Sequence, residues 1–277
     1  MFSNKKIAAL VISLAIYGLA HFGPFSHSVA ALERSSSQEV VAGSNLATQF
    51  SACKDYFPNS QPAVPDNVRD QSRELCFDDF AVLYSSKTKT PVYAVEKLNR
   101  ARLEAAKGEQ RTNKFYEEAR LPRAERSTLS DYHQANLSKD CREYNICYDR
   151  GHNAPAGDRS TDEAMAQSFS LANMFPQISE HNRKTWSDIE KATRKYVMRA
   201  RGDVFVFTGP YYDPAKEPNF IGNGVRVPDV IWKLVFDSSN GKMFVYWSRN
   251  ASGEHVEAPI SYDDFVSRTG MDLIKKT

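Results

Sequence analysis

Three apolar runs in the last quarter of the chain constrain its fold more than any other feature. They cover residues 204–208 (VFVFT), 230–236 (VIWKLVF) and 243–247 (MFVYW), and the sequence Asp-Ser-Ser-Asn-Gly-Lys separates the last two. Short runs of β-branched and aromatic residues around an Asn-Gly step are typical of antiparallel strands joined by a turn. Because Gly-Pro is a turn signal, we expect the first strand to end at Gly209-Pro210.

The rest of the chain adds one more hairpin and a few helices. Residues 80–84 (FAVLY) and 91–95 (PVYAV) flank the polar sequence Ser-Ser-Lys-Thr-Lys-Thr, which predicts a hairpin. Small and apolar residues at helical spacing predict a helix within 161–172. From Glu180 onward, apolar residues recur every three or four positions and predict an amphipathic helix of about five turns. Residues 261–275 can form a short C-terminal helix.

Composition and charge limit the class of protein. Of the 277 residues, 41% are hydrophobic and 25% are charged, which is typical of a globular protein with a sizeable core. The formal charge of +2 excludes a histone-like protein that binds nucleic acid by bulk charge. Residues 97–120 and 123–147 contain few apolar positions, so we expect mainly loop and surface there. The sequence therefore predicts an α+β chain with a single domain over residues 49–277.

The N-terminus has the pattern of a secretory signal. Lys5 and Lys6 precede an uncharged run over residues 7–20, and Ser28-Val29-Ala30 suits cleavage after Ala30. The run is shorter than the roughly 20 residues that span a bilayer, although a membrane anchor and a buried helix are the alternatives. We interpret residues 1–30 as a signal peptide and residues 31–48 as a flexible leader. This predicts a secreted or periplasmic protein with no stable membrane association after cleavage.

The chain has four cysteines, and in an oxidising compartment an even count suggests disulfides. Because short loops close most readily, the favoured pairs are Cys53–Cys76 and Cys141–Cys147 among three pairings. A zinc site is the alternative, but the spacings lack the close Cys-x-x-Cys pairs that such sites generally use.

The sequence Cys-Tyr-Asp-Arg-Gly-His-Asn-Ala-Pro at 147–155 concentrates reactive side chains. Arg150 offers a cation for phosphate, Gly151 permits close backbone approach, and His152 is a proton acceptor near neutral pH. A lone histidine is more often a surface or core residue, but the neighbours of His152 make it a candidate for catalysis.

A second cluster follows at a defined distance. Asn-x-x-Pro-Gln occupies 173–177, and Asn182, Trp186 and Glu190 come after it. With Asp-Arg-Gly-His at 149–152, this order and spacing resembles the DNA/RNA non-specific endonucleases, the Serratia-type nucleases with the ββα-metal fold. The resemblance extends from the hairpin near residue 80 through Arg111 to the last strands, which end at residue 247. It implies a central antiparallel sheet flanked by helices and long loops.

The resemblance also implies roles for five side chains. His152 matches the general base that takes a proton from the attacking water. Asn182 matches the side-chain ligand of one Mg²⁺ ion, with Mn²⁺ as a substitute, and Glu190 matches the carboxylate that contacts the metal through water. Arg150 and Arg111 match the arginines that hold phosphate and offset charge in the transition state. Arg111 stands in an Arg-x-Asn context where the family often has Arg-Asn.

Three further residues are expected to support the site. By the same resemblance, Asn173 orders the loop, and Asp149 and Gly151 complete the motif. His181 adjoins Asn182, but adjacent helical residues point about 100° apart, so we interpret it as structural. Trp186 is interpreted as the core anchor of its helix.

Helix geometry separates the two residues that the resemblance assigns to the metal. Eight residues at 1.5 Å each give about 12 Å of rise, with a rotation of roughly 80°. Asn182 and Glu190 would therefore not hold one ion directly, which favours a contact of Glu190 through water. Mg²⁺ suits a site with one protein ligand and substrate phosphate.

Cations on the same helix are candidates for contacts with the substrate backbone, namely Arg183, Lys184 and Lys191. The function predicted is an exported, Mg²⁺-dependent endonuclease that hydrolyses DNA and RNA with little sequence preference. The alternatives are a metal-dependent phosphodiesterase for another substrate and a nucleic-acid-binding protein without catalysis. The predicted partners are DNA and RNA, and the sequence leaves a homodimer open.

Overall fold

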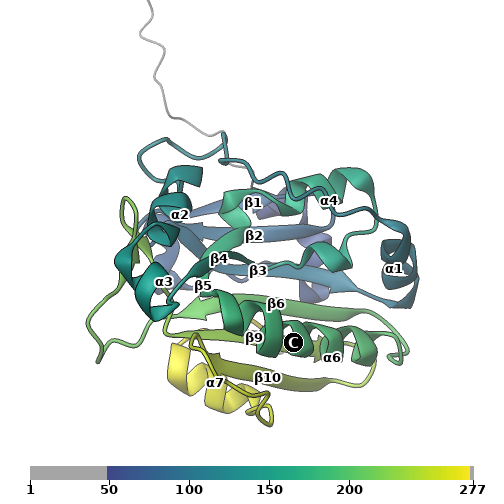
Figure 1. Cartoon of the computed structure of the whole chain (residues 1–277). Coiled ribbons are helices and arrows are strands. Elements are labelled where there is room, and N and C mark those ends of the chain that lie inside the picture. Colours follow the sequence, from purple (N-terminus) through teal and green to yellow (C-terminus); the bar gives the residue numbers. More distant parts are fainter. Residues whose placement is uncertain (1–48, 275–277) are drawn as a thin grey trace, which may run out of the picture. The chain divides into compact units, whose positions relative to one another are not determined.

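The computed structural model describes residues 49–274 of the chain (Figure 1). The predicted signal peptide and leader, residues 1–48, lie outside the described residues. Short 3-10 turns begin the described part, between Phe50 and Gln71. The strands are β1 (Ser72–Cys76), β2 (Phe80–Ser85), β3 (Thr90–Leu98), β4 (Tyr148–His152), β5 (Met174–Ile178), β6 (Val204–Tyr211), β7 (Phe220–Ile221), β8 (Val225–Arg226), β9 (Val230–Asp237) and β10 (Lys242–Arg249).

The helices are α1 (Arg100–Ala105), α2 (Leu129–Asn136), α3 (Lys139–Tyr144), α4 (Asp162–Ser168), α5 (Ser179–His181), α6 (Ser187–Val197) and α7 (Tyr262–Thr269). A π-helical turn, Asn182–Trp186, joins α5 to α6. Within residues 49–274, no helix is long and apolar enough to cross a membrane.

A six-stranded antiparallel sheet in the order β1-β2-β3-β6-β9-β10 forms the centre of the molecule (Figure 1). Successive residues of a strand point to opposite faces. On one face, Phe207 and Trp232 pack with Phe265 of α7. On the other face, Val206 of β6 packs with Val197 of α6. Because both faces of the sheet are covered, the inner strands β2, β6 and β9 are apolar at most positions. The predicted α+β class is confirmed.

The predicted hairpins form, but β6 is longer than expected. It continues through Gly209 and Pro210 to Tyr211, paired with β9. The indole of Trp232 lies so close to Gly209 that a Cβ there would meet its Cζ2 at 2.5 Å. The indole Nε1 also donates to the carbonyl of Pro210 at 3.0 Å. Gly209 therefore makes room for a core tryptophan instead of ending the strand.

The expectation of mainly loop between 97 and 147 is wrong for three short helices. Each begins at a side chain that accepts a hydrogen bond from a backbone N–H of the first turn. Asn99 does so for α1 and Ser138 for α3, and Thr128 forms a capping box with Asp131 at the start of α2. These caps stabilise helices of six to eight residues whose polar sequences carry no apolar periodicity. The other predicted helices form within shorter limits, α4 ending at Ser168 and α7 at Thr269.

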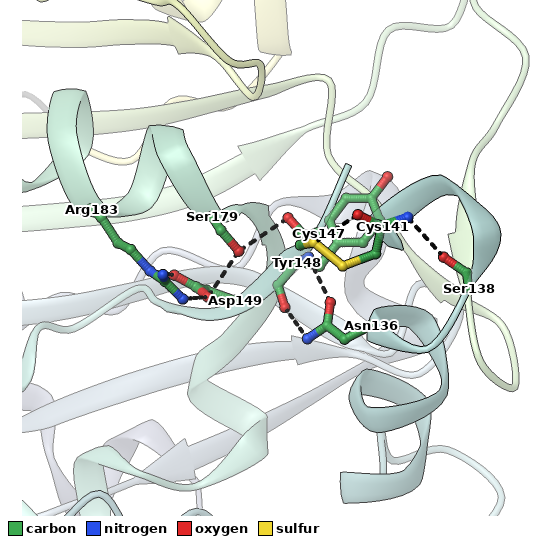
Figure 2. Close-up of a disulfide and its surroundings, with 8 residues drawn as sticks. All are labelled: Asn136, Ser138, Cys141, Cys147, Tyr148, Asp149, Ser179 and Arg183. Carbon is green, nitrogen blue, oxygen red and sulfur yellow. Dashed lines mark hydrogen bonds and ion pairs between the residues drawn. A yellow bond between two sulfur atoms is a disulfide. The ribbon is translucent and has the colours of Figure 1, made fainter. Parts of the chain in front are cut away.

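Both predicted disulfides are present, Cys53–Cys76 and Cys141–Cys147. The first joins the N-terminal 3-10 turns to β1. The second closes a loop from α3 to the residue before β4 (Figure 2). The described residues contain no free cysteine.

Candidate active site

The two sequence motifs lie on neighbouring strands. The Asp-Arg-Gly-His motif forms β4, and the Asn-x-x-Pro-Gln motif leads into β5, which pairs antiparallel with it. In this register His152 is opposite Met174 and Asp149 is opposite Gln177. Because β5 leads directly into α5 and the π-helical turn, Asn182 follows closely behind it. Two strands and a helix thus bring together Asp149 and Asn182, which are 33 positions apart in the sequence.

Two predicted supporting residues fix this strand pair. A Cβ on Gly151 would meet Oε1 of Gln177 at 2.3 Å, so only glycine fits at this point of β4. The buried side chain of Asn173 accepts from the N–H of Ala154 at 2.9 Å and donates to the carbonyls of Ala154 and Ser168. Asn173 therefore holds the chain that leaves β4 against the start of β5.

His152 lies at the end of β4, in an aromatic pocket. Its ring is 5.1 Å from that of Phe169, in an edge-to-face arrangement, and 5.9 Å from that of Phe115. Only 8% of the residue is exposed, and its Nε2 is buried without a hydrogen-bond partner. No hydrogen bond in the described part of the chain involves Nδ1, and Nδ1 is not among the buried unpaired atoms, so it is the ring nitrogen with access to the surface.

The surroundings of His152 keep its imidazole neutral. Burial lowers the pKa of His152 to about 3, and the positive charges of Arg111, Arg159 and Arg150 act in the same direction. A buried ring next to three guanidinium groups cannot easily take up a further charge. His152 is therefore an uncharged base at any pH near neutrality.

The two predicted arginines come from different segments, and both lie against the aromatic pocket of His152. Arg150 lies over the ring of Phe115 at 4.1 Å, and Arg111 lies over the ring of Phe169 at 5.0 Å. The two rings also contact each other, with centroids 4.9 Å apart. Phe115 and Phe169 were missed by sequence reasoning, although Phe115 follows Arg111 by only four positions. Aromatic faces of this kind attract guanidinium groups and orient them.

Asp149 organises the residues at the start of the helix (Figure 2). Its carboxylate accepts hydrogen bonds from Asn182 Nδ2 at 2.9 Å, Ser179 Oγ at 2.9 Å and the guanidinium of Arg183. Burial alone would raise the pKa of Asp149, but the hydrogen bonds from Arg183, Asn182 and Ser179 outweigh it and hold the pKa below its usual range.

The rotation expected between Asn182 and Glu190 needs correction. The sequence argument assumed a regular α-helix, whereas residues 182–186 form a π-helical turn. A π turn uses five-residue spacing and appears mostly as a single turn, often at functional sites. The rotation about the helix axis between the side chains of Asn182 and Glu190 therefore differs from the roughly 80° of a regular α-helix. In the described part of the chain, no hydrogen bond joins the two side chains.

Glu190 lies above a buried group of charges that the sequence did not reveal. Burial raises the pKa of Glu190 to about 7, although Lys233 and Arg194 oppose the shift. On the sheet below, Glu96 of β3 forms a buried ion pair with Arg159, and Lys233 of β9 donates to Thr208 at 2.6 Å. The remaining pair of the group joins Arg194 to Asp158 at 3.0 Å. Glu96 and Lys233 each stand within a mainly apolar strand, so the sequence did not indicate that they belong to one buried group of charges.

The three predicted backbone contacts are exposed, and each already has an acidic partner. Arg183 pairs with Asp149, Lys184 with Glu180 and Lys191 with Asp188. Within residues 49–274, none of the three cations contacts His152. His181 is buried, with both ring nitrogens hydrogen-bonded to Gln177 and Ser248, and Trp186 is fully buried. Their interpretation as structural residues agrees with these positions.

Comparison with known proteins identifies a matching family and several relatives that are named nucleases. Residues 59–276 match the family model of the DNA/RNA non-specific endonucleases. Nuclease C1 of Cunninghamella echinulata var. echinulata is 30% identical over 204 residues, which cover 68% of this chain and 75% of the relative. The mitochondrial Nuclease 1 of Schizosaccharomyces pombe is 29% identical over 66% of this chain, and the matched region spans only 56% of that relative.

The fold also resembles a solved structure. A chain in the crystal structure of the EndoG/EndoGI complex superposes with a TM-score of 0.64 at 22% identity, over 81% of this chain and 90% of that chain. This likeness supports the predicted ββα-metal fold.

The predicted secreted or periplasmic location is wrong on these comparisons. Similar proteins from Schizosaccharomyces pombe and Saccharomyces cerevisiae are named mitochondrial nucleases, and so is the human protein, endonuclease G. The apolar N-terminal run that suggested export lies outside the described residues. The predicted family, by contrast, is confirmed, because the match over residues 59–276 includes both motifs and the whole six-stranded sheet. The chain belongs to the DNA/RNA non-specific endonuclease family.

Proposed function

We propose that the chain is a Mg²⁺-dependent endonuclease that hydrolyses phosphodiester bonds of DNA and RNA with little sequence preference, and that His152 is its general base. The observation that carries the proposal is the environment of His152. Its imidazole is neutral, its Nε2 is enclosed, and its Nδ1 has access to the surface beside two arginines.

The base acts at one defined atom. Nδ1 of His152 accepts a proton from the attacking water, whose oxygen forms a bond to phosphorus. The bond from phosphorus to the leaving oxygen breaks, and that oxygen keeps the electron pair and takes a proton from solvent. Because burial and, after it, three guanidinium groups disfavour imidazolium, the proton is then released to solvent. Arg150 and Arg111 offset the negative charge that gathers on the phosphate oxygens in the transition state.

The residues present fit one Mg²⁺ ion. Asp149 holds Nδ2 of Asn182, so the amide oxygen is left without a hydrogen bond among the described residues and serves as the protein ligand. The carboxylate of Glu190 has no ion pair or hydrogen bond within residues 49–274, and it can accept hydrogen bonds from water near the metal. Mg²⁺ usually keeps several waters and needs few protein ligands. When bound, the ion supplies Lewis acidity for the phosphoryl and leaving oxygens, and Mn²⁺ can substitute for it.

A digestion assay with the full chain tests this proposal. Plasmid DNA and a long RNA are incubated with the purified protein in Mg²⁺, in Mn²⁺ and in chelator. We expect internal cleavage of both nucleic acids with either metal and none in chelator. Cleavage that persists in chelator would contradict the metal requirement, and a folded protein that cuts only a small phosphodiester would identify a different substrate class.

A further inference from the structure

A basic pocket lies at the end of α6, away from the residues described above. It has a volume of about 510 Å³ and lies where α6 ends and β9 turns into β10. Its lining includes three exposed cations, Arg199, Arg201 and Lys242, together with Tyr196 and Asp237. Neither the family match nor the proposed catalytic site assigns a role to it.

The cations of this pocket differ from those nearer to the catalytic residues. Arg183, Lys184, Lys191 and Arg194 each form an ion pair with a carboxylate. In the part of the chain that the structure describes, the three pocket cations form no ion pair. Their positive charges are therefore available to a ligand from solution.

The one acid of the pocket does not neutralise them. Asp237 is buried, and its carboxylate accepts hydrogen bonds from Tyr196 Oη at 2.9 Å, Ser239 N at 3.0 Å and Oγ at 2.6 Å, and Asn240 Nδ2 at 3.0 Å. These four donors occupy the carboxylate from within the fold. Three cations against one such acid leave an excess of positive charge at the surface.

The exposed side of α6 leads from Glu190, at the candidate active site, to the pocket. At 100° per residue, Arg199 lies about 180° around the helix from Glu190, and Lys191 and Lys195 lie between them. The helical turn continues to Arg199, whose N–H donates to the carbonyl of Tyr196 at 2.9 Å. Nine residues at 1.5 Å give about 13.5 Å of rise. Because one strand of a duplex advances about 3.4 Å per nucleotide, this rise together with the width of the helix separates the two positions by several nucleotides.

We propose that Arg199, Arg201 and Lys242 form a second phosphate-binding site, which holds the backbone of the nucleic-acid substrate several nucleotides from the bond that is cleaved. The inference rests on the proposed function, since it assumes a nucleic-acid substrate at His152. The site contributes affinity that depends on substrate length and on salt, because its cations contact phosphates.

A charge-removal variant with a matched control tests the site. The variant is Arg199→Gln/Arg201→Gln/Lys242→Gln, and the control, Lys54→Gln/Lys87→Gln/Lys139→Gln, removes the same charge at other exposed positions. Binding is measured by fluorescence anisotropy in the His152→Ala background, with a DNA of about 30 nucleotides over a range of salt concentrations. Cleavage is measured in the unmodified background, with DNA of graded length from about four nucleotides upward.

We expect the pocket variant to bind the long DNA about ten-fold more weakly than the control, with a salt slope smaller by about one or more. Its KM for long DNA should rise while kcat and the cleavage of the shortest substrate stay unchanged. Equal affinity and equal salt slope in the two variants would overturn the second site. Failure of the unmodified protein to cut any length would instead overturn the proposed function, so the two outcomes are distinguishable.

Discussion

Asp149 and Asn182 are joined by a hydrogen bond of 2.9 Å in which the amide Nδ2 donates to Oδ2 of the carboxylate. Because an ionised carboxylate only accepts, this contact fixes which end of the amide faces Asp149. The amide oxygen is left for another partner. Asp149 thus positions the proposed metal ligand, which is a more specific role than the general support that the motif suggested.

Removal of Asp149 should therefore weaken metal binding. In Asp149→Ala we expect the Kd for Mg²⁺ to rise about 10- to 100-fold, as is common when the partner of a metal ligand is lost. Isothermal titration calorimetry of the metal-free proteins measures this change. The matched control is Arg183→Gln, which loses an exposed ion pair with Asp149 but keeps the Asn182 contact, and it should differ little from the unmodified protein. Equal affinities in all three proteins would refute the positioning role.

The disulfide Cys141–Cys147, which directly precedes β4, should contribute to both stability and activity. Ser179 connects it to the site, because its N–H donates to the carbonyl of Cys147 and its hydroxyl donates to Asp149 (Figure 2). For a loop this short, we expect Cys141→Ser/Cys147→Ser to lose about 2 kcal/mol of unfolding free energy, or about 5 °C in Tm, and to show a several-fold lower kcat.

The other disulfide provides the control for that experiment. Cys53–Cys76 closes a longer loop and lies outside the strand pair of the site, so Cys53→Ser/Cys76→Ser should lower Tm and leave kcat unchanged. If loss of Cys141–Cys147 altered neither Tm nor kcat, the disulfide would have no part in holding β4.

Gly151 should tolerate no side chain. A Cβ at this position would meet Gln177 Cβ at 2.7 Å and Phe175 Cε2 at 2.9 Å, both on the paired strand β5. We expect Gly151→Ala to lose about 1–3 kcal/mol of stability by overpacking and to displace His152 enough to reduce kcat. Denaturant titration and steady-state kinetics check both effects. Gly108→Ala, where a Cβ meets nothing within 4 Å, is the control, and identical behaviour of the two variants would argue against the close approach.

The strands were predictable from the sequence, whereas the surroundings of the candidate site were not. Runs of β-branched and aromatic residues and the Asn240-Gly241 turn predict β9 and β10, and the family resemblance names His152 and Asn182 as candidates. The short helix α2 depends on the capping box of Thr128, which apolar periodicity does not detect. Short polar helices therefore form because of local hydrogen bonds of this kind, and a pattern of apolar residues does not predict them.

Buried charges are the second feature that the sequence concealed. Lys233 stands within an otherwise apolar strand, where a lysine suggests a solvated face, yet its amine is buried under Trp186. Only the packing of α6 on β9 reveals that Lys233 balances Glu96 and Glu190. The apolar periodicity also predicts a regular α-helix where the π-helical turn Asn182–Trp186 forms.

His181 should make the fold sensitive to acid. Burial lowers its pKa from 6.5 to about 4, so between these values the unfolded chain binds a proton that the native protein does not. Stability therefore falls as the pH decreases through this window, by about 3 kcal/mol in total from His181, and His152 acts with the same sign. We expect His181→Gln to show a shallower loss of unfolding free energy between pH 6.5 and 4. Parallel stability profiles for the two proteins would contradict this assignment.

The most direct test concerns His152 as the base. Single-turnover cleavage of DNA in Mg²⁺ is compared for the unmodified protein and His152→Ala, with the Tm and the Mg²⁺ affinity of both measured as controls for folding and metal binding. We predict a loss of about 10²- to 10⁴-fold in the cleavage rate, with partial recovery when imidazole is added. A variant that retained the full rate, with fold and metal affinity intact, would show that a different group takes the proton.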